Sequence, residues 1–290
     1  MEAFLSWVAG LAEVGRLPEA FQYAFVTRGM LAILLVAPLL GVISHLVVAR
    51  RLAFFSAALG HAALTGITIG LVLGEPLNGP YGGLFGFCLL CGLSMVYVRR
   101  NSSLPPDTLV GVFLALTLGL GICLLVAVTK RFNIHQIEAV MFGSLLTVTD
   151  QDLLLLALVT LLVGATLVRN YNRWVFDSLD SRLAAVSGVA TGRLEYLFVV
   201  MLTLSIVVSL KIIGALLVEA LVVVPAAAAR NLSRSMVSYV TWSVAMALAA
   251  CVTGLFISNH WALPTGGAIV LSMSALFFLS LGIGKLFRRN

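Results

Sequence analysis

The chain has 290 residues, of which 61% are hydrophobic and only 10% are charged, whereas about a quarter of the residues in an ordinary soluble domain are charged. Its mean hydropathy is +1.09, and no water-soluble core could bury that much apolar surface. The composition therefore excludes a soluble globular protein and indicates an integral membrane protein, with a formal net charge of +6.

Apolar runs of roughly 18 to 24 residues follow one another, which is the length that a helix needs to cross a hydrocarbon core of about 30 Å. A transmembrane barrel would need shorter segments of alternating polarity, and a run such as Leu153 to Val168 has none. We therefore predict an all-α, polytopic transmembrane helix bundle, a single domain over residues 1–290, with about nine spans and eight as the alternative. The predicted spans are 26–49, 53–74, 80–98, 108–129, 151–168, 193–210, 212–229, 236–257 and 263–284.

Two segments are expected to stay outside the hydrocarbon core. Residues 1–24 lack a basic start followed by a long apolar run, so we interpret them as an interfacial amphipathic segment and not as a cleaved signal peptide. The segment from Ile134 to Val148 is too short and too interrupted to cross the bilayer. We predict that it is a partly buried or interfacial helix.

Lysine and arginine residues indicate the orientation, because loops rich in them stay in the cytoplasm. With the N-terminus outside and the C-terminus cytoplasmic, thirteen of the eighteen fall on the cytoplasmic side. These are Arg50, Arg51, Arg99, Arg100, Arg169, Arg173, Arg182, Arg193, Arg230, Arg234, Lys285, Arg288 and Arg289. The other five are Arg16, Arg28, Lys130, Arg131 and Lys211. Topology thus explains the basic excess, and nucleic-acid binding is not expected.

The longest predicted cytoplasmic loop, 170–192, contains a short helix from Asp180 to Gly188. Asp180 is a favourable N-cap and Gly188 a favourable C-terminal residue, and Ser181, Arg182 and Leu183 form the first turn. Such a helix could dock on a soluble partner or lie on the membrane, and the residues alone do not choose between the two.

Two ionisable residues fall near the middle of predicted spans, His61 in the second and Glu219 in the seventh. An ionisable side chain near the bilayer centre costs about 2.5 kcal/mol or more, so it usually faces a cavity or a partner. Carboxylate and imidazole together suit Zn(II) or Mn(II). We predict that both line a translocation pathway; the alternatives are a protonated Glu219 carboxyl bonded to a neighbouring helix and a purely structural His61.

Pro225 lies in the same predicted span as Glu219. A proline removes one backbone donor and frees the carbonyl of Leu221, and a kinked helix with exposed backbone oxygens suits a permeation path. Small residues recur at helix-packing spacing in Gly82-x-x-x-Gly86 and from Ala226 to Ala229. They are expected to pack helices within the subunit or along a homodimer seam.

Five stretches resemble the membrane subunits of ATP-driven zinc, manganese and iron importers, a family of ABC-importer permeases, and are closest to the bacterial zinc-uptake permease. They are RRLAFFSAALGHAALTG (50–66), MFGSLLTVTDQDL (141–153), DSRLAAVSG (180–188), KIIGALLVEALVVVPAAAAR (211–230) and LPTGGAIV (263–270), which occur in the family's order.

The resemblance implies a homodimeric permease in the bacterial plasma (inner) membrane that works by alternating access. It implies a cytoplasmic ATP-binding subunit, an extracellular or periplasmic metal-binding protein, and Zn(II) or Mn(II) as substrate, with no cofactor on this chain itself. The helix from Asp180 to Gly188 then resembles part of the surface that couples to the ATPase. His61 matches a histidine of the family, but members usually carry an aspartate four residues earlier, where this chain has Ala57. Glu219 is expected to supply the missing negative charge.

Three other functions are weighed against a metal permease. An ion-coupled secondary transporter would use Glu219 as a proton site, and an ABC permease could carry a metal complex or another small solute. An intramembrane protease is disfavoured because the sequence has no H-E-x-x-H and no G-x-S-x-G in a span. A Walker sequence ending in Gly-Lys-Ser/Thr is also missing, so ATP hydrolysis is expected on a separate chain.

Overall fold

The structure is a computed structural model, and it describes residues 7, 10, 22–76, 80–129, 148–261 and 263–288. Within these ranges nine helices are long and apolar enough to cross a membrane. They are α2 (Ala24–Ala49), α3 (Ala53–Val72), α4 (Tyr81–Asn101), α5 (Pro106–Thr129), α7 (Asp150–Leu179), α9 (Thr191–Ile213), α10 (Ala215–Leu232), α11 (Met236–Trp261) and α12 (Thr265–Arg288). The predicted all-α bundle with nine spans is therefore confirmed for the described part of the chain.

Two predicted segments fall almost entirely outside the described residues. They are the interfacial segment over residues 1–24 and the helix from Ile134 to Val148. Most of the family-like stretch over residues 141–153 lies outside them as well, although its last residues begin α7. Both segments therefore remain predictions.

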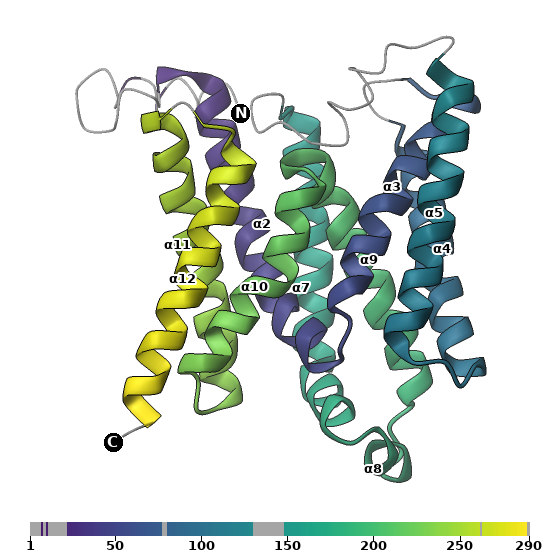
Figure 1. The fold of residues 1–290 in the computed structure, drawn as a ribbon, viewed down its shortest axis with the longest axis vertical. Helices are drawn as coiled ribbons and strands as arrows, with labels where there is room; N and C mark the ends of the chain where they lie inside the picture. Colours follow the sequence, from purple (N-terminus) through teal and green to yellow (C-terminus); the bar gives the residue numbers. More distant parts are fainter. Residues whose placement is uncertain are drawn as a thin grey trace.

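The helices are arranged in two groups joined by a middle set (Figure 1). α3 packs against α4 and α5, whereas α10, α11 and α12 pack against one another. α2 contacts α7, α10 and α11, and α9 contacts α4 and α7, so these helices connect the groups. α2 begins at one end of the bundle, and α12 ends at the opposite end together with the short helix α8 (Ser181–Val186).

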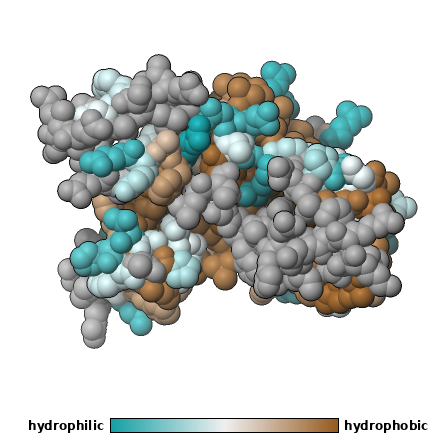
Figure 2. Space-filling view, turned by 90° about the horizontal axis from the view of Figure 1, so that it is seen from above, coloured by the Kyte–Doolittle hydropathy of each residue, from teal (hydrophilic) through white to brown (hydrophobic). Residues whose placement is uncertain are grey.

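Apolar side chains cover the outside of the bundle as well as its core. Leu161, Val168 and Leu271 are among the large hydrophobic residues that remain exposed. Seen from the end where α2 begins, hydrophobic residues lie at several places along the rim of the molecule (Figure 2). A soluble protein rarely exposes so large a contiguous apolar surface, which fits helices that have lipid as their solvent.

Glycines set the close contact between α3 and α4, but not at the predicted spacing. A Cβ added at Gly83 would lie 2.5 Å from both the Gly66 carbonyl oxygen and the Gly70 nitrogen, whereas one added at Gly86 would meet nothing within 4 Å. Gly86 therefore packs against no helix among the described residues of the same chain, and a homodimer seam at Gly86 stays a prediction. Gly83 is the residue whose lack of a side chain lets the two backbones approach.

The loop predicted over residues 170–192 is shorter than expected, because α7 continues to Leu179. Its last turns are held by tertiary contacts: Trp174 is fully buried and donates a hydrogen bond to the Leu194 carbonyl oxygen of α9 at 3.1 Å, and Arg50 pairs with Asp177. Polar residues such as Asn170 and Arg173 suggested a loop, but they lie on a helix that extends beyond the expected span.

Candidate functional site

Glu219 and His61, both predicted to line a translocation pathway, lie near each other on two neighbouring helices. Glu219 lies in the second turn of α10 and His61 lies in the middle of α3, and both residues are half-buried. α3 and α10 contact each other, and the Glu219 carboxylate reaches α3 at Gly60, the residue directly before His61. The structure thus supports the proximity of an acid and an imidazole, which are groups that ligate divalent metals.

Gly60 explains how the Glu219 carboxylate reaches α3. A Cβ added at Gly60 would lie 3.0 Å from Glu219 Oε1 and 3.8 Å from the Ala215 Cβ. A side chain at this position would therefore crowd the carboxylate. Gly60 was not predicted from the sequence, because its contact with Glu219 depends on the packing of α3 against α10.

The site lies on a side of the bundle that the single chain leaves partly open. On α3, Phe54, Ala57 and His61 are exposed or half-exposed while most of the helix is buried. On α10, Leu216 and Glu219 are likewise at least partly exposed. Side chains three to four residues apart share one face of a helix, so each helix presents one open strip that carries one of the two ionisable residues.

The site offers few ligands in one copy of the chain. Among the described residues, no group of three or more His, Cys, Asp or Glu side chains lies close enough to hold a metal ion. Ala57 leaves the position one turn before His61 without a donor. A site of two donors suits brief binding of a passing cation better than permanent retention.

Pro225 is buried in α10, and the backbone next to it bonds to α2. The Ala226 N–H donates to Ser44 Oγ at 3.0 Å, and Ser44 lies 3.3 Å from Ser243 Oγ of α11. The Ser243 hydroxyl in turn donates to the Gly41 carbonyl oxygen at 2.7 Å. The proline region is thus tied to α2 and α11, and a role of Pro225 in shaping a path stays a prediction.

The short helix predicted from Asp180 to Gly188 is present as α8, with the expected caps. Asp180 Oδ1 accepts hydrogen bonds from the backbone N–H groups of Arg182 at 2.9 Å and Leu183 at 3.0 Å. Gly188 ends the segment with φ at +83°, a conformation that glycine adopts at little cost. α8 stands at the end of the bundle (Figure 1) and leaves Leu183 54% exposed and Val186 87% exposed.

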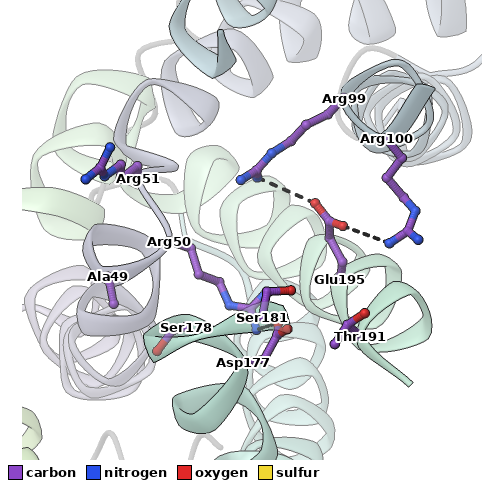
Figure 3. A pocket seen from close by; sticks show the side chains of 10 residues that line it. All are labelled: Ala49, Arg50, Arg51, Arg99, Arg100, Asp177, Ser178, Ser181, Thr191 and Glu195. Atoms are coloured by element: carbon purple, nitrogen blue, oxygen red, sulfur yellow. Dashed lines mark hydrogen bonds and ion pairs between the residues drawn. The ribbon is translucent and has the colours of Figure 1, made fainter. Parts of the chain in front are cut away.

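A basic pocket of about 340 Å³ lies beside α8. Its charged lining consists of Arg50, Arg51, Arg99 and Arg100 with Asp177 and Glu195 (Figure 3). The pairs at residues 50–51 and 99–100 were interpreted only as topology signals, because the positive-inside rule accounts for them fully. The packing of the helix ends brings these four arginines together, and their spacing in the sequence could not predict it.

Arg50 is the most deeply placed cation of this pocket. Its Nη2 lies 2.7 Å from Asp177 Oδ2, and its guanidinium stacks over the Phe198 ring with 5.0 Å to the centroid. Burial lowers the pKa of the Arg50 guanidinium from its ordinary value, and Asp177 opposes that effect. The charge is therefore stabilised by its partner rather than by water.

A second ion-pair network ties helices at the opposite end. Lys211 Nζ lies 2.7 Å from Asp152 Oδ1, and the Tyr81 hydroxyl donates to the same oxygen at 2.7 Å. These residues come from α9, α7 and α4. Lys211 was predicted to lie on the outer side, but its ion pair with Asp152 was not predicted, because the two residues are far apart in sequence.

The nine apolar helices of the described residues define a polytopic membrane protein, and two ionisable residues inside neighbouring spans, His61 and Glu219, are typical of the transporter class. Residues 22–284 match the ABC 3 transport family. The chain belongs to this family and is a membrane permease, which confirms the resemblance found in the sequence.

Relatives and a solved structure agree with this assignment. The chain is 30% identical to the high-affinity zinc uptake system membrane protein ZnuB of Haemophilus influenzae, over 87% of this chain and 94% of the relative. It is 26% identical to the manganese import system permease protein ScaB of Streptococcus gordonii, over 89% and 91%. The structure of PsaBC from Streptococcus pneumoniae in complex with Fab is similar with a TM-score of 0.78 and 25% identity, and covers 97% of this chain and 95% of that chain.

Proposed function

We propose that this chain is the membrane-spanning subunit of an ATP-driven importer for divalent metal ions, with Zn(II) or Mn(II) as substrate. The observation that carries the proposal is that the Glu219 carboxylate of α10 reaches α3 next to His61, where a Cβ added at Gly60 would lie 3.0 Å from Glu219 Oε1. Relatives named for zinc and manganese transport point to the same substrates. ATP hydrolysis belongs to a separate cytoplasmic subunit, and a metal-binding protein delivers the cation from outside.

The orientation of this subunit follows from its basic residues. The N-terminus lies outside and the C-terminus lies in the cytoplasm of a bacterial inner membrane, so α8 and the basic pocket face the ATP-binding subunit. Docking on the ATP-binding subunit would cover the exposed Leu183 and Val186 side chains of α8, and a helix that lies on the membrane is the alternative. Asp180, Ser181, Arg182, Leu183 and Gly188 form or cap the coupling helix. A homodimer would cover the open strips of α3 and α10.

The chemistry of the site fits passage of a cation. A divalent ion that leaves water needs compensation for lost hydration, and a carboxylate and an imidazole supply one negative charge and one neutral donor. With only two protein donors, the cation keeps part of its hydration shell and is released readily. Alternating access then exposes the pair first to the outside and then to the cytoplasm.

The test is metal uptake by membrane vesicles that contain the complete complex. Glu219→Gln keeps the size of the side chain but removes its charge, and we expect uptake to fall by about tenfold or more. Asp107→Asn serves as the control, because it removes an exposed carboxylate in the first turn of α5. Unchanged uptake by the Glu219→Gln complex would refute the pathway role.

A second substrate class is favoured by the small number of donors. Because Ala57 replaces an anionic ligand of the family, a metal complex that brings its own ligands would suit a site with only two donors. Uptake assays with chelated and free metal separate these substrates. An ion-coupled transporter with Glu219 as its proton site would take up substrate without ATP. Uptake by the same vesicles with and without ATP therefore distinguishes it from an ATP-driven importer.

A further inference from the structure

His45 is a buried histidine that the candidate site between α3 and α10 does not use. It lies near the end of α2, and only 1% of it is exposed. Its Nδ1–H donates to the Val42 carbonyl oxygen of the same helix. In the neutral imidazole this leaves Nε2 with a lone pair that can only accept a hydrogen bond. Ionisable residues inside a span almost always face a partner or a cavity, so Nε2 calls for a donor.

Two tyrosines pack against His45 from different helices. The centroid of the imidazole ring lies 5.6 Å from that of Tyr171 on α7 and 5.8 Å from that of Tyr239 on α11. α2 contacts both of these helices and stands between them in Figure 1. α11 packs with α10 and α12, whereas α7 packs against α9. His45 therefore lies where two parts of the bundle meet.

Three polar atoms of this cluster are buried without a hydrogen-bond partner among the residues that the structure describes. They are His45 Nε2 and the hydroxyl oxygens of Tyr171 and Tyr239. A tyrosine near the end of a span usually directs its hydroxyl to the membrane surface, but both of these oxygens are buried. Because buried polar atoms are nearly always bonded in folded proteins, the three atoms indicate a ligand between them.

The serines next to the cluster do not supply the missing partner. Ser243 lies one turn from Tyr239 on α11 and donates to the Gly41 carbonyl oxygen at 2.7 Å. Ser44, which precedes His45, accepts from the Ala226 N–H at 3.0 Å. Both hydroxyls are thus bonded within the seam between α2, α10 and α11, and the unpartnered atoms are confined to the histidine and the two tyrosines.

Water fits these three atoms better than a metal ion does. One imidazole and two neutral hydroxyls offer no negative charge to a cation that leaves water. Among the described residues, no group of three or more His, Cys, Asp or Glu side chains could hold a metal. A water molecule, in contrast, can donate to Nε2 and accept from both hydroxyls. Three hydrogen bonds are typical of a buried water.

We propose that His45 Nε2 and the hydroxyls of Tyr171 and Tyr239 bind one buried water molecule, which joins α2 to α7 and α11. Each tyrosine hydroxyl donates to the water, and the water donates to Nε2. Water-mediated hydrogen bonds are nearly as favourable as direct ones. The site therefore holds two parts of the bundle together toward the end where α8 lies, whichever solute the chain carries.

Thermal unfolding of the purified full-length chain in detergent tests the proposal. Tyr171→Phe and Tyr239→Phe each remove one hydroxyl, and we expect each to lower the midpoint of unfolding by about 2–4 °C, because one net hydrogen bond is lost. Tyr97→Phe makes the same change at a tyrosine that is 62% exposed and should leave the midpoint unchanged. If the two buried hydroxyls had no ligand, their removal would leave the midpoint unchanged or raise it, and that result would overturn the proposal.

Coupling between the variants shows whether the three residues share one ligand. With both hydroxyls bonded to the same water, the double tyrosine variant should lose less than the sum of the two single losses. Neither tyrosine change should matter in a His45→Leu background, whereas His45→Gln, which keeps an acceptor, should preserve most of the effect. Additive losses would overturn the shared water, and if His45→Leu does not fold, the two tyrosine variants decide.

A metal ion at the same three atoms is the competing outcome. Added Zn(II) would then raise the midpoint of the wild-type chain, and the part of that rise that depends on this site would be lost in His45→Gln. Such a result would assign the cluster to metal and overturn the proposal. A rise of the same size in both chains would place the metal elsewhere and leave the water as the ligand.

Discussion

Ala57 occupies the position at which the resemblance in the sequence implies an aspartate. It lies four residues before His61 on the same face of α3, and both are half-buried. A carboxylate there would add a hard oxygen donor, which Mn(II) prefers. We expect Ala57→Asp to raise the affinity for Mn(II) by about tenfold, measured by metal binding to the purified permease.

The matched control is Ala57→Asn, which adds a similar volume without the charge. Its Mn(II) affinity should stay close to that of the wild-type chain. If Ala57→Asp bound Mn(II) no better than Ala57→Asn, position 57 would not face the pathway. That result would also remove the reason for treating Glu219 as a compensating ligand.

Gly60 gives a second prediction at the scale of single residues. Its Cβ would lie 3.0 Å from Glu219 Oε1, so Gly60→Ala should push the carboxylate away from α3 without unfolding the chain. We expect uptake to fall about threefold to tenfold, because misplacement of a ligand by a fraction of an ångström weakens a site. Gly164→Ala on α7 is the control, since its Cβ meets nothing within 4 Å. Equal uptake by the two variants would contradict the assigned contact.

Some residues of the candidate sites can be recognised from the sequence, and others cannot. His61 and Glu219 stand out because an ionisable group inside an apolar run is costly wherever the helix packs. Gly60 and the arginines around the basic pocket do not stand out. Their contacts join residues more than 40 positions apart, such as Arg50 with Asp177 and Arg100 with Glu195, and only the packed structure brings these together.

At the scale of elements, the crossing of α3 and α4 depends on Gly83. We expect Gly83→Ala to lower the free energy of unfolding by about 1–3 kcal/mol, because its Cβ would overlap backbone atoms of Gly66 and Gly70. Gly86→Ala on the same helix should be neutral, since its Cβ meets nothing within 4 Å. Thermal unfolding in detergent measures both, and equal stability of the two variants would contradict the crossing.

The spans themselves were predictable because length and apolarity decide membrane insertion. The ends of the helices were harder to predict. α9 continues through Lys211 to Ile213, and the turn into α10 is made by Gly214 alone, with φ at +83°. α7 runs eleven residues beyond its predicted span (179 − 168 = 11) because Trp174 is buried and Asp177 pairs with Arg50. These extensions follow from contacts with other helices and have no signature in local hydropathy.

At the scale of the whole molecule, the basic pocket and α8 gather at one end, and the Lys211–Asp152 network lies at the other. The ionisable pair lies between them on an open side of the bundle. Sequence predicted the polarity of the bundle from its basic loops, but it could not predict which helices are neighbours. The packing of α3 against α10 is what turns two isolated ionisable residues into a candidate site.

The most direct measurement is ATP-driven uptake by the complex reconstituted with its ATP-binding subunit and metal-binding protein, across a panel of free and chelated divalent metals. The account predicts accumulation of Zn(II) or Mn(II) that requires ATP and is lost in Glu219→Gln. Absence of uptake with every metal, free or chelated, would contradict the proposal that the substrate is a divalent metal. Uptake that proceeds equally without ATP would contradict the importer mechanism.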